Sequence, residues 1–239
     1  MATCRILIVV SNPAVSTTTG WPVGFWAGEL IHPYDAFTAA GHEVTIASPD
    51  GGVVRMDALS DPRDASGYSA EDTLSADYLA RPAFLSLLAG TPRLDDLDLD
   101  TFDAIVVAGG QAPMFTFDTA ETLHAALLRF HDAGKPTAAL CHGVSALLHL
   151  RNDDGSPFLR GRTITGFTNE EEDQADAAVG QKLMPFRIED VATEQGARFE
   201  ARPAWSPFAM RDGHLITGQQ QHSGGETARL VLETLKALP

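Results

Sequence analysis

Short runs of consecutive apolar residues alternate along most of the chain with longer segments in which apolar residues recur at helical spacing. Short apolar runs rich in β-branched residues are typical of strands buried on both faces, as in a parallel sheet. Such runs predict strands over residues 5–10, 43–48, 102–108, 137–140, 162–167 and 214–218. The longer segments and their start and stop signals predict helices that end near 40, cover 73–89 and 119–133, begin near 144 and 170, and cover 185–195 and 227–238.

This order of elements predicts one α/β domain over residues 1–239, with a doubly wound, mostly parallel sheet flanked by helices. Residues 56–69 contain Pro, Asp, Ser and Gly without a clear period, so we expect a loop that covers the sheet edge. Two roles fit that loop, a fixed cover and a lid. In open α/β sheets ligands bind at the carboxyl ends of the strands, so residues that follow the strands are the first candidates for chemistry.

Cys141 lies at the corner between a predicted strand and the next helix. Ala139 and Gly143 stand two residues to either side, which is the small-x-nucleophile-x-small pattern of a nucleophile elbow. Small flanking residues let the backbone turn sharply, and the free N–H groups of the following helix favour a thiolate. A buried, inert cysteine is the alternative, because cysteine is common in cores. The adjacent His142 and the change from strand to helix favour the nucleophile.

Gly109, Gly110 and Gln111 follow the third predicted strand. Small residues let backbone N–H groups approach a ligand, and two such donors form an oxyanion hole. The N–H of Gly110 or Gln111 and that of His142 are the expected donors. A Gly-Gly pair is also common in ordinary turns, so the pair indicates an oxyanion hole only in combination with Cys141.

Glu29 lies in the most aromatic stretch of the chain, one turn after Phe25 and Trp26. A carboxyl group in apolar surroundings tends to stay protonated. A neutral carboxyl can donate a hydrogen bond to a thiolate or act as a general acid or base. A solvated glutamate on an amphipathic helix is the alternative, and spacing alone favours it.

His142 is a candidate base, although neighbouring residues leave a corner in different directions and contact with Cys141 is not guaranteed. A third group, a carboxylate, would have to orient His142. Three adjacent glutamates at 170–172 follow a predicted strand end and could supply that carboxylate. Asn169 is the expected N-cap of their helix, and carboxylates in a first turn also act simply as capping groups.

Charge and composition argue against several functions. The net charge of −15 disfavours nucleic-acid and anionic-membrane partners, which bind clustered Lys and Arg. No stretch approaches the roughly 20 apolar residues of a membrane helix. Two cysteines, Cys4 and Cys141, make no disulfide framework, and without a secretory signal pattern we expect a cytoplasmic protein. The chain lacks metal-ligand spacing and the glycine signatures of nucleotide sites, so we expect no cofactor.

Motifs along most of the chain combine into one ordered set. They are GFWAGEL at 24–30 with Pro33, ASPDGG at 47–52, FDA at 102–104 with Gly109 and Gly110, ALCHG at 139–143, TGFTNEEE at 165–172 with MPF at 184–186, and LITGQ at 215–219. This set resembles the ThiJ/PfpI superfamily, which has the class I glutamine amidotransferase-like fold, and within it the branch of heat-shock chaperones and glyoxalase III enzymes. The match runs from Arg5 to the C-terminus, and only the ordered set is specific.

The resemblance implies a flavodoxin-like domain that is usually dimeric, so a homodimer is expected. It implies Cys141 as the nucleophile, with Glu29 hydrogen-bonded to it. It implies His142 as the proton carrier, oriented by one of the three glutamates, of which Glu172 is the best match. The further substrate-site residues expected from it are Gly110, Gln111, Trp26 and Gln219.

In glyoxalases of this kind the thiolate adds to the aldehyde of methylglyoxal and a proton moves between the two carbons. Hydrolysis then gives a 2-hydroxy acid without glutathione or metal. The resemblance therefore implies a small aldehyde substrate and no cofactor. Two segments depart from the branch: Gly-Gly-His-Gly is replaced by GGQA at 109–112, and Thr-Gly-Gln-Asn-Pro-x-Ser by TGQQQHS at 217–223. Both changes fall at the expected pocket, so they bear on the substrate more than on the fold.

Two other functions stay open. The first is a different enzyme on the same scaffold, such as an isonitrile hydratase, an amidase or an amidotransferase-like protein. Amidotransferases on this sheet carry a late His-x-Glu, which His214 and His222 do not match. The second is a holdase chaperone or redox sensor, in which Cys141 would be oxidised to a sulfinic acid instead of turning over.

Overall fold

The computed structural model describes residues 3–237. Its strands are β1 (Arg5–Val9), β2 (Ala14–Val15), β3 (Pro22–Val23), β4 (Glu43–Ala47), β5 (Ala104–Val107), β6 (Thr137–Leu140), β7 (Thr163–Ile164), β8 (Arg198–Phe199), β9 (Ala209–Asp212) and β10 (Leu215–Gly218). Its α-helices are α1 (Ala27–Ala39), α2 (Thr73–Leu79), α3 (Pro82–Ala89), α4 (Pro113–Thr116), α5 (Glu121–Asp132), α6 (Ser145–Leu148), α7 (Asn169–Val179), α8 (Ile188–Glu194) and α9 (Gly224–Ala237). Its 3₁₀ helices are η1 (Ala58–Ser60), η2 (Leu94–Asp96), η3 (Leu99–Thr101), η4 (Cys141–Val144) and η5 (Gln221–Ser223).

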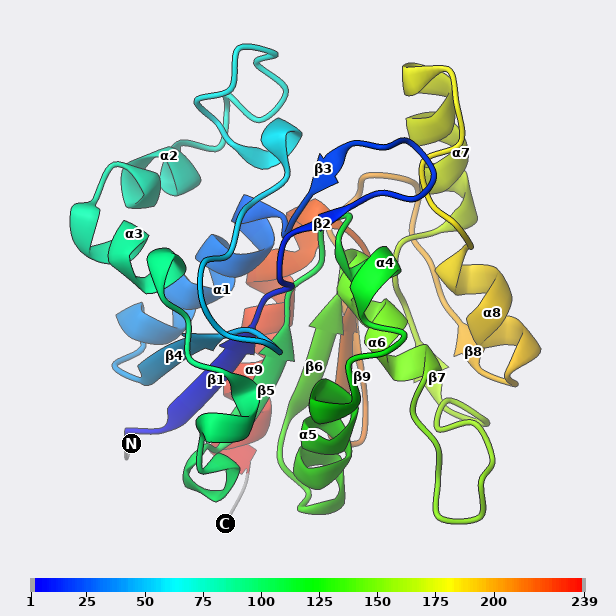
Figure 1. Ribbon diagram of the computed structural model, residues 1–239. Coiled ribbons are helices and arrows are strands. Elements are labelled where there is room, and N and C mark those ends of the chain that lie inside the picture. Colours follow the sequence, from blue (N-terminus) through cyan, green and yellow to red (C-terminus); the bar gives the residue numbers. More distant parts are fainter. Residues whose placement is uncertain (1–2, 238–239) are drawn as a thin grey trace.

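A six-stranded sheet in the order β4-β1-β5-β6-β10-β9 forms the centre of the molecule (Figure 1). β1 pairs in parallel with β4 and β5, and β6 pairs in parallel with β5 and β10. The edge strand β9 runs antiparallel to β10. The arrangement confirms the predicted mostly parallel α/β fold. The carboxyl ends of the parallel strands meet at one edge, where sites form in such sheets.

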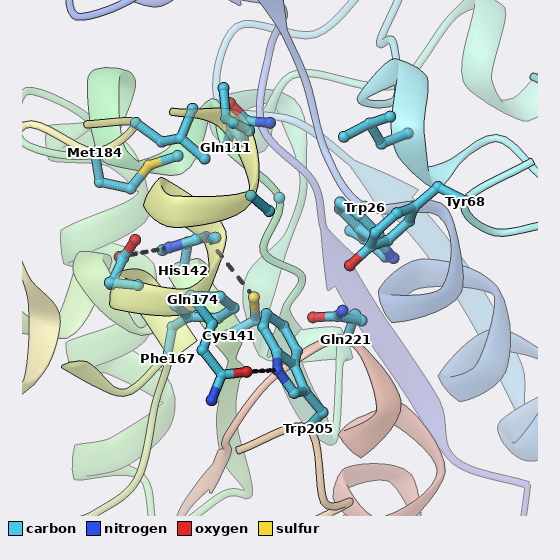
Figure 2. Close-up of a pocket in the computed structure, with 17 residues that line it drawn as sticks. Trp26, Tyr68, Gln111, Cys141, His142, Phe167, Gln174, Met184, Trp205 and Gln221 are labelled. Atoms are coloured by element: carbon cyan, nitrogen blue, oxygen red, sulfur yellow. Dashed lines mark hydrogen bonds and ion pairs between the residues drawn. The ribbon is translucent and has the colours of Figure 1, made fainter. Parts of the chain in front are cut away.

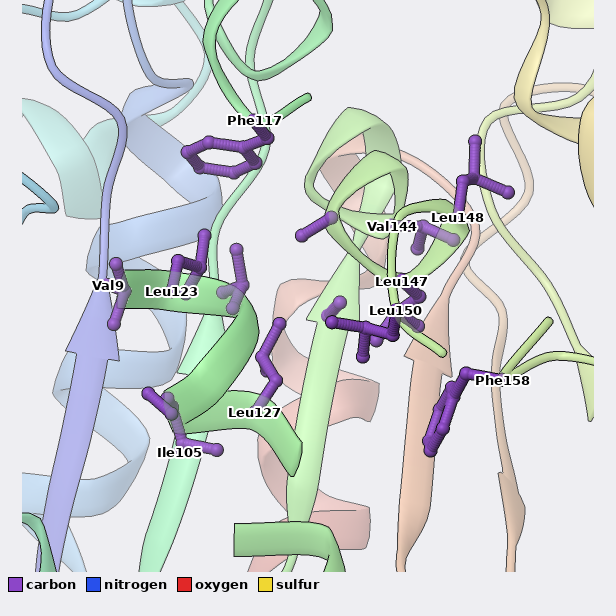
Figure 3. Packing of buried hydrophobic residues seen from close by; sticks show 14 of the residues in the cluster. Val9, Ile105, Phe117, Leu123, Leu127, Val144, Leu147, Leu148, Leu150 and Phe158 are labelled. Carbon is purple, nitrogen blue, oxygen red and sulfur yellow. The ribbon is translucent and has the colours of Figure 1, made fainter. Parts of the chain in front are cut away.

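Successive strand residues enter two cores on opposite faces of the sheet. Val9 and Ile105 join the core under α5 and α6, which also contains Leu123 and Leu127 of α5 (Figure 3). Ile8 and Val106 join the other core, which α1 and α9 cover. Because side chains alternate between the faces of a strand, continuous apolar runs are what a sheet covered on both faces requires.

Two predicted elements differ from the structure. The helix predicted over 73–89 is two helices, α2 and α3, because Pro82 restricts Arg81 to extended backbone (φ −92°, ψ 115°). The strand predicted over 162–167 consists of the two residues of β7, which pair with β8 outside the main sheet. Local apolar content does not say which sheet a short strand joins.

The N-cap of α7 is Thr168, so the prediction of Asn169 as N-cap is wrong. Thr168 Oγ1 accepts a hydrogen bond from the Glu171 N–H at 3.1 Å, and the Glu171 carboxylate accepts one from the Thr168 N–H at 3.0 Å. This reciprocal pair is a capping box. The last predicted helix agrees with α9, and position 238 of that prediction lies outside the described residues.

The segment 56–69 is a loop, as predicted, with η1 as a single turn within it. Met56 forms a β-bridge with Phe25, and the Asp57 N–H donates to the Phe25 carbonyl at 2.8 Å. The Ser69 hydroxyl donates to the Leu59 carbonyl at 2.6 Å. These bonds hold the loop beside the start of α1. Separately, none of the helices within residues 3–237 combines the length and the apolar character needed to cross a membrane.

Candidate active site

The turn from β6 into η4 places Cys141 at the carboxyl edge of the sheet. Cys141 has a φ of +55°, a conformation that non-glycine residues seldom adopt. Such backbone costs on the order of 1–3 kcal/mol and persists where surrounding structure holds it, often at active sites. Gly143 is part of that support, because a Cβ there would lie 2.8 Å from the carbonyl oxygens of Val107 and Ala108. The small residue predicted at this position therefore lets η4 pack against the end of β5.

His142 and Glu172 lie together behind the thiol. His142 Nδ1 is 3.8 Å from Cys141 Sγ, and His142 Nε2 is 3.0 Å from Glu172 Oε1. Both members of the His142–Glu172 pair are buried. An Nε2–H that donates to the carboxylate leaves the lone pair of Nδ1 facing the sulfur, which is the tautomer a base needs.

The three adjacent glutamates have three different surroundings. Glu172 faces His142, as expected from the resemblance. Glu171 is buried in the capping box, and its Oε1 accepts hydrogen bonds from the Trp205 N–H and from the Gln219 amide. Glu170 is exposed. The 3.6-residue helical period sends consecutive side chains in different directions, so one glutamate of the three reaches the site.

Glu29 is fully buried, which excludes the solvated alternative. Its Oε2 accepts a hydrogen bond from the Gly109 N–H at 2.7 Å, and its carboxyl group is hydrogen-bonded to Cys141. Burial is the main cause that raises the pKa of Glu29 to about 8, and the two hydrogen bonds oppose that rise. The carboxyl is therefore mostly protonated at neutral pH.

Burial and the neighbouring Glu29 raise the pKa of the Cys141 thiol well above its ordinary value, while a hydrogen bond from the His142 backbone N–H lowers it. The expected thiolate-favouring N–H donor is present, but burial outweighs it. A protonated Glu29 carries no charge to repel the sulfur and can donate a hydrogen bond to it. The thiolate therefore depends on the protonation state of Glu29.

A further buried carboxyl group, that of Asp57, accepts hydrogen bonds from the backbone on both sides of the site and was not anticipated from the sequence. Asp57 Oδ1 accepts from the Gly24 N–H at 2.8 Å, and Oδ2 accepts from the Gln111 N–H at 2.6 Å. Burial raises the pKa of Asp57 to about 7, against the effect of these two hydrogen bonds. Since Asp57 occupies the Gln111 N–H, Gly110 is the expected donor left facing the pocket. Asp57 lies in a loop without periodicity, so no sequence signal distinguished it from other loop aspartates.

The cavity above Cys141 has a volume of about 310 Å³. Figure 2 shows Cys141 between one side that bears His142 and Phe167 and another that bears Trp26 and Tyr68. Phe167 stacks on His142 with ring centroids 4.3 Å apart, and Trp26 meets Tyr68 edge to face at 6.0 Å. Aromatic side chains therefore fix the position of the proposed base and form much of the wall.

The expected substrate-site residues do not all reach this cavity. Trp26, Gly110 and Gln111 line it. Gln219 is fully buried elsewhere, where its side-chain amide donates to Glu171 at 2.8 Å and its oxygen accepts from the Arg202 N–H at 2.8 Å. Gln219 therefore contacts the start of α7 through Glu171 and does not line the cavity wall.

Tyr68, Trp205 and Gln221 line the cavity and were not singled out from the sequence. Tyr68 and Trp205 come from long connections, and Trp205 has a φ of +66°. Neither connection has a helical or strand period, so only tertiary contacts determine where these side chains point. Gln221 lies in the segment 217–223, where the chain departs from the family pattern. That departure was the sequence signal that pointed to this part of the cavity.

The described residues offer no built site for a metal. No group of three or more His, Cys, Asp or Glu within residues 3–237 has a geometry that could hold an ion. The cavity lining includes the Cys141 thiol, the His142 imidazole and the Glu172 carboxyl group. Such a set suits nucleophilic addition and proton transfer.

The chain is similar to known proteins over nearly all of its length. The chain is 27% identical over 232 residues to Glyoxalase 3 of Candida albicans, covering 95% of this chain and 96% of that protein. It is 27% identical over 236 residues to the Glutathione-independent glyoxalase HSP31 of Saccharomyces cerevisiae, covering 97% of each. Among solved structures, Rapid Encystment Protein 24 kDa of Francisella tularensis superposes with a TM-score of 0.87 at 26% identity, over 98% of this chain and 99% of that one. Residues 23–234 match the model of the DJ-1/PfpI family, and the chain belongs to that family.

Proposed function

We propose that this protein is a glutathione- and metal-independent glyoxalase that converts methylglyoxal or a similar 2-oxoaldehyde to a 2-hydroxy acid. The observation that carries the proposal is the placement of Cys141 between a buried Glu29 and the His142–Glu172 pair, at the base of a cavity. The printed names of two full-length relatives, a glyoxalase 3 and a glutathione-independent glyoxalase, support it.

The first chemical step is addition of the Cys141 thiol across the aldehyde C=O. A bond forms between sulfur and the aldehyde carbon C1, and the thiol proton ends on the C1 oxygen. Protonated Glu29 donates a hydrogen bond to the sulfur as negative charge develops on it. The product is a hemithioacetal.

The second step is proton transfer between the two carbons. His142 Nδ1 removes the C1 proton, and the electron pair forms an enediolate across C1 and C2. The Gly110 N–H is the proposed donor to the enediolate oxygen. His142 returns the proton to C2, and the proton of the C1 hydroxyl passes to the C2 oxygen, which gives a thioester with a C2 hydroxyl group.

The third step is hydrolysis. Water attacks the thioester carbon, the C–S bond breaks, and the 2-hydroxy acid leaves with regeneration of Cys141. The sum is one 2-oxoaldehyde plus one water to one 2-hydroxy acid. No external oxidant or reductant enters the balance.

The test is lactate formation from methylglyoxal in the absence of glutathione and added metal. We expect the wild type to form lactate and Cys141→Ser to lose at least about 1,000-fold in kcat, because the nucleophile is lost. Cys4→Ser is the matched control, because Cys4 immediately precedes β1 and is not among the residues that line the cavity. Equal activity in Cys141→Ser, or wild-type activity that needs glutathione, would refute the proposal.

The assembly and location remain part of the proposal. We infer a homodimer, as the family resemblance implies, and a cytoplasmic location, which two cysteines without a disulfide framework support. Sedimentation velocity tests the first point, and a mass of one 25.5 kDa chain would contradict it. Cell fractionation tests the second.

A further inference from the structure

The cavity is larger than the three-carbon aldehyde in the proposed reaction. Its volume is about 310 Å³, within the range of roughly 300–1,000 Å³ for sites that hold drug-sized ligands. Methylglyoxal has five non-hydrogen atoms. Even at the roughly 30 Å³ that a water molecule occupies in the liquid, five such atoms fill about half of the cavity. Much of the volume is therefore left for something attached to the reacting carbonyls.

The extra space extends along α7, away from the thiol. On α7, Ala175 and Val179 lie three and seven residues after Glu172 and so share one face of the helix with it. Ala178 lies beside them, and all four residues line the cavity. At a rise of about 1.5 Å per residue, Ala178 lies roughly 9 Å along the helix axis from Glu172. Two alanines in this stretch keep the cavity wide. Leu183 and Met184, which follow the end of α7, line the same cavity.

The chemistry of the wall indicates what that space accepts. The wall is mostly aliphatic and aromatic, with Trp26, Phe167 and Trp205 among its rings, and Gln111, Gln174 and Gln221 add neutral amide groups. None of the described residues that line it is Lys or Arg. A phosphate, carboxylate or sugar substituent would lose its water without gaining a charged partner there. An aromatic ring would instead meet the edges and faces of other rings.

Resting on the proposed glyoxalase function, we propose that this site selects uncharged 2-oxoaldehydes with an aryl or branched alkyl substituent over methylglyoxal, and that the α7 face at Ala175, Ala178 and Val179 holds the substituent. The reacting carbonyls lie at Cys141 and His142, and the substituent lies beyond Glu172. The balance of the reaction is unchanged: phenylglyoxal plus water gives mandelate.

The experiment compares kcat/KM for phenylglyoxal and methylglyoxal in the wild type, Ala178→Leu and Ala177→Leu. Ala177 is the matched control, because it is an alanine of the same helix and is exposed like Ala178, but it does not line the cavity. We expect phenylglyoxal to be favoured at least tenfold by the wild type. Ala178→Leu should lower that preference at least tenfold by filling the substituent space, and Ala177→Leu should leave both values at the wild-type level.

Three outcomes decide between the possibilities. A wild-type preference for methylglyoxal, or equal losses for both substrates in Ala178→Leu, overturns the inference and leaves the proposed function standing. Turnover of neither substrate refutes the proposed function.

In that case the neutral, unreactive analogues 2-hydroxyacetophenone and hydroxyacetone test the cavity directly, by quenching of Trp fluorescence. Tighter binding of hydroxyacetone, or equal loss of binding in Ala177→Leu and Ala178→Leu, overturns the assignment of α7.

Discussion

At the scale of single residues, the site depends on which side chains are buried beside Cys141. Glu29 and Glu172 are both buried glutamates, but their carboxyl groups have different partners. Glu29 shares a buried contact with the thiol and has a raised pKa, whereas Glu172 accepts from an imidazole. Two buried carboxyl groups near one candidate nucleophile can therefore take different roles: one holds a proton, and the other orients the imidazole.

The role of Glu172 can be separated from the general effect of losing a negative charge in α7. Glu172→Gln should lower kcat by roughly 100-fold or more, because a neutral amide no longer fixes the Nδ1 lone pair of His142 toward the thiol. Glu170→Gln removes the same charge two positions earlier, at an exposed site, and should leave kcat within about twofold. Steady-state lactate formation with each purified variant measures both. Similar losses in the two variants would show that the charge of the helix matters and not the contact with His142.

The sequence marked Cys141 and His142 as candidates because they follow a predicted strand and Cys141 has small neighbours. The family resemblance, not the spacing, implied Glu29 and Glu172, and the fold places Glu29 beside Cys141 and Glu172 beside His142. Asp57 and Trp205 could not be found in this way. Each comes from a connection without a period, and contacts with distant parts of the chain determine its position.

At the scale of elements, the apolar runs predicted the central strands well because each is buried on both faces. The start of α7 was placed one residue too late because two neighbouring residues both carry an N-cap signal. Residues 168–171 contain a Thr-x-x-Glu capping signal, but the neighbouring Asn169 is also a good N-cap residue. The structure selects Thr168 because the Glu171 side chain turns back to the Thr168 N–H.

This reading of the start of α7 predicts a difference between two adjacent substitutions. Thr168→Ala removes the hydroxyl that accepts from the Glu171 N–H and should lower the free energy of unfolding by about 1 kcal/mol. Asn169→Ala removes an exposed hydrogen bond to Asp190 and should cost less, within about 0.5 kcal/mol. Urea denaturation of both variants at one pH measures the difference. A larger cost for Asn169→Ala would restore Asn169 as the cap.

At the scale of the whole molecule, buried acids link folding to pH. Asp57 and Glu29 are carboxyl groups with pKa values raised by burial to about 7 and about 8. Between the ordinary pKa of each group and its raised value, the folded state holds a proton that the unfolded state has released. Stability should therefore fall as pH rises through this window, which is the reverse of the behaviour of a salt-bridged carboxylate. The net charge of −15 adds self-repulsion in the same direction.

A comparison of matched variants isolates the part due to Glu29. Its pKa is 4.5 when unperturbed and about 8 in the folded state, so replacement by Gln removes a proton that is taken up on folding. The free energy of unfolding of Glu29→Gln, relative to wild type, should rise with pH between about 5 and 8, by at most about 1.4 kcal/mol per pH unit, and level off above 8. Glu194→Gln makes the same substitution at the exposed end of α8, and its difference from wild type should stay nearly constant with pH. Urea denaturation at pH 5, 6, 7, 8 and 9 measures both differences.

If Glu29→Gln instead lost stability relative to wild type as pH rose, Glu29 would be charged in the folded protein. Its proposed role as a neutral hydrogen-bond donor to the thiolate would then be wrong.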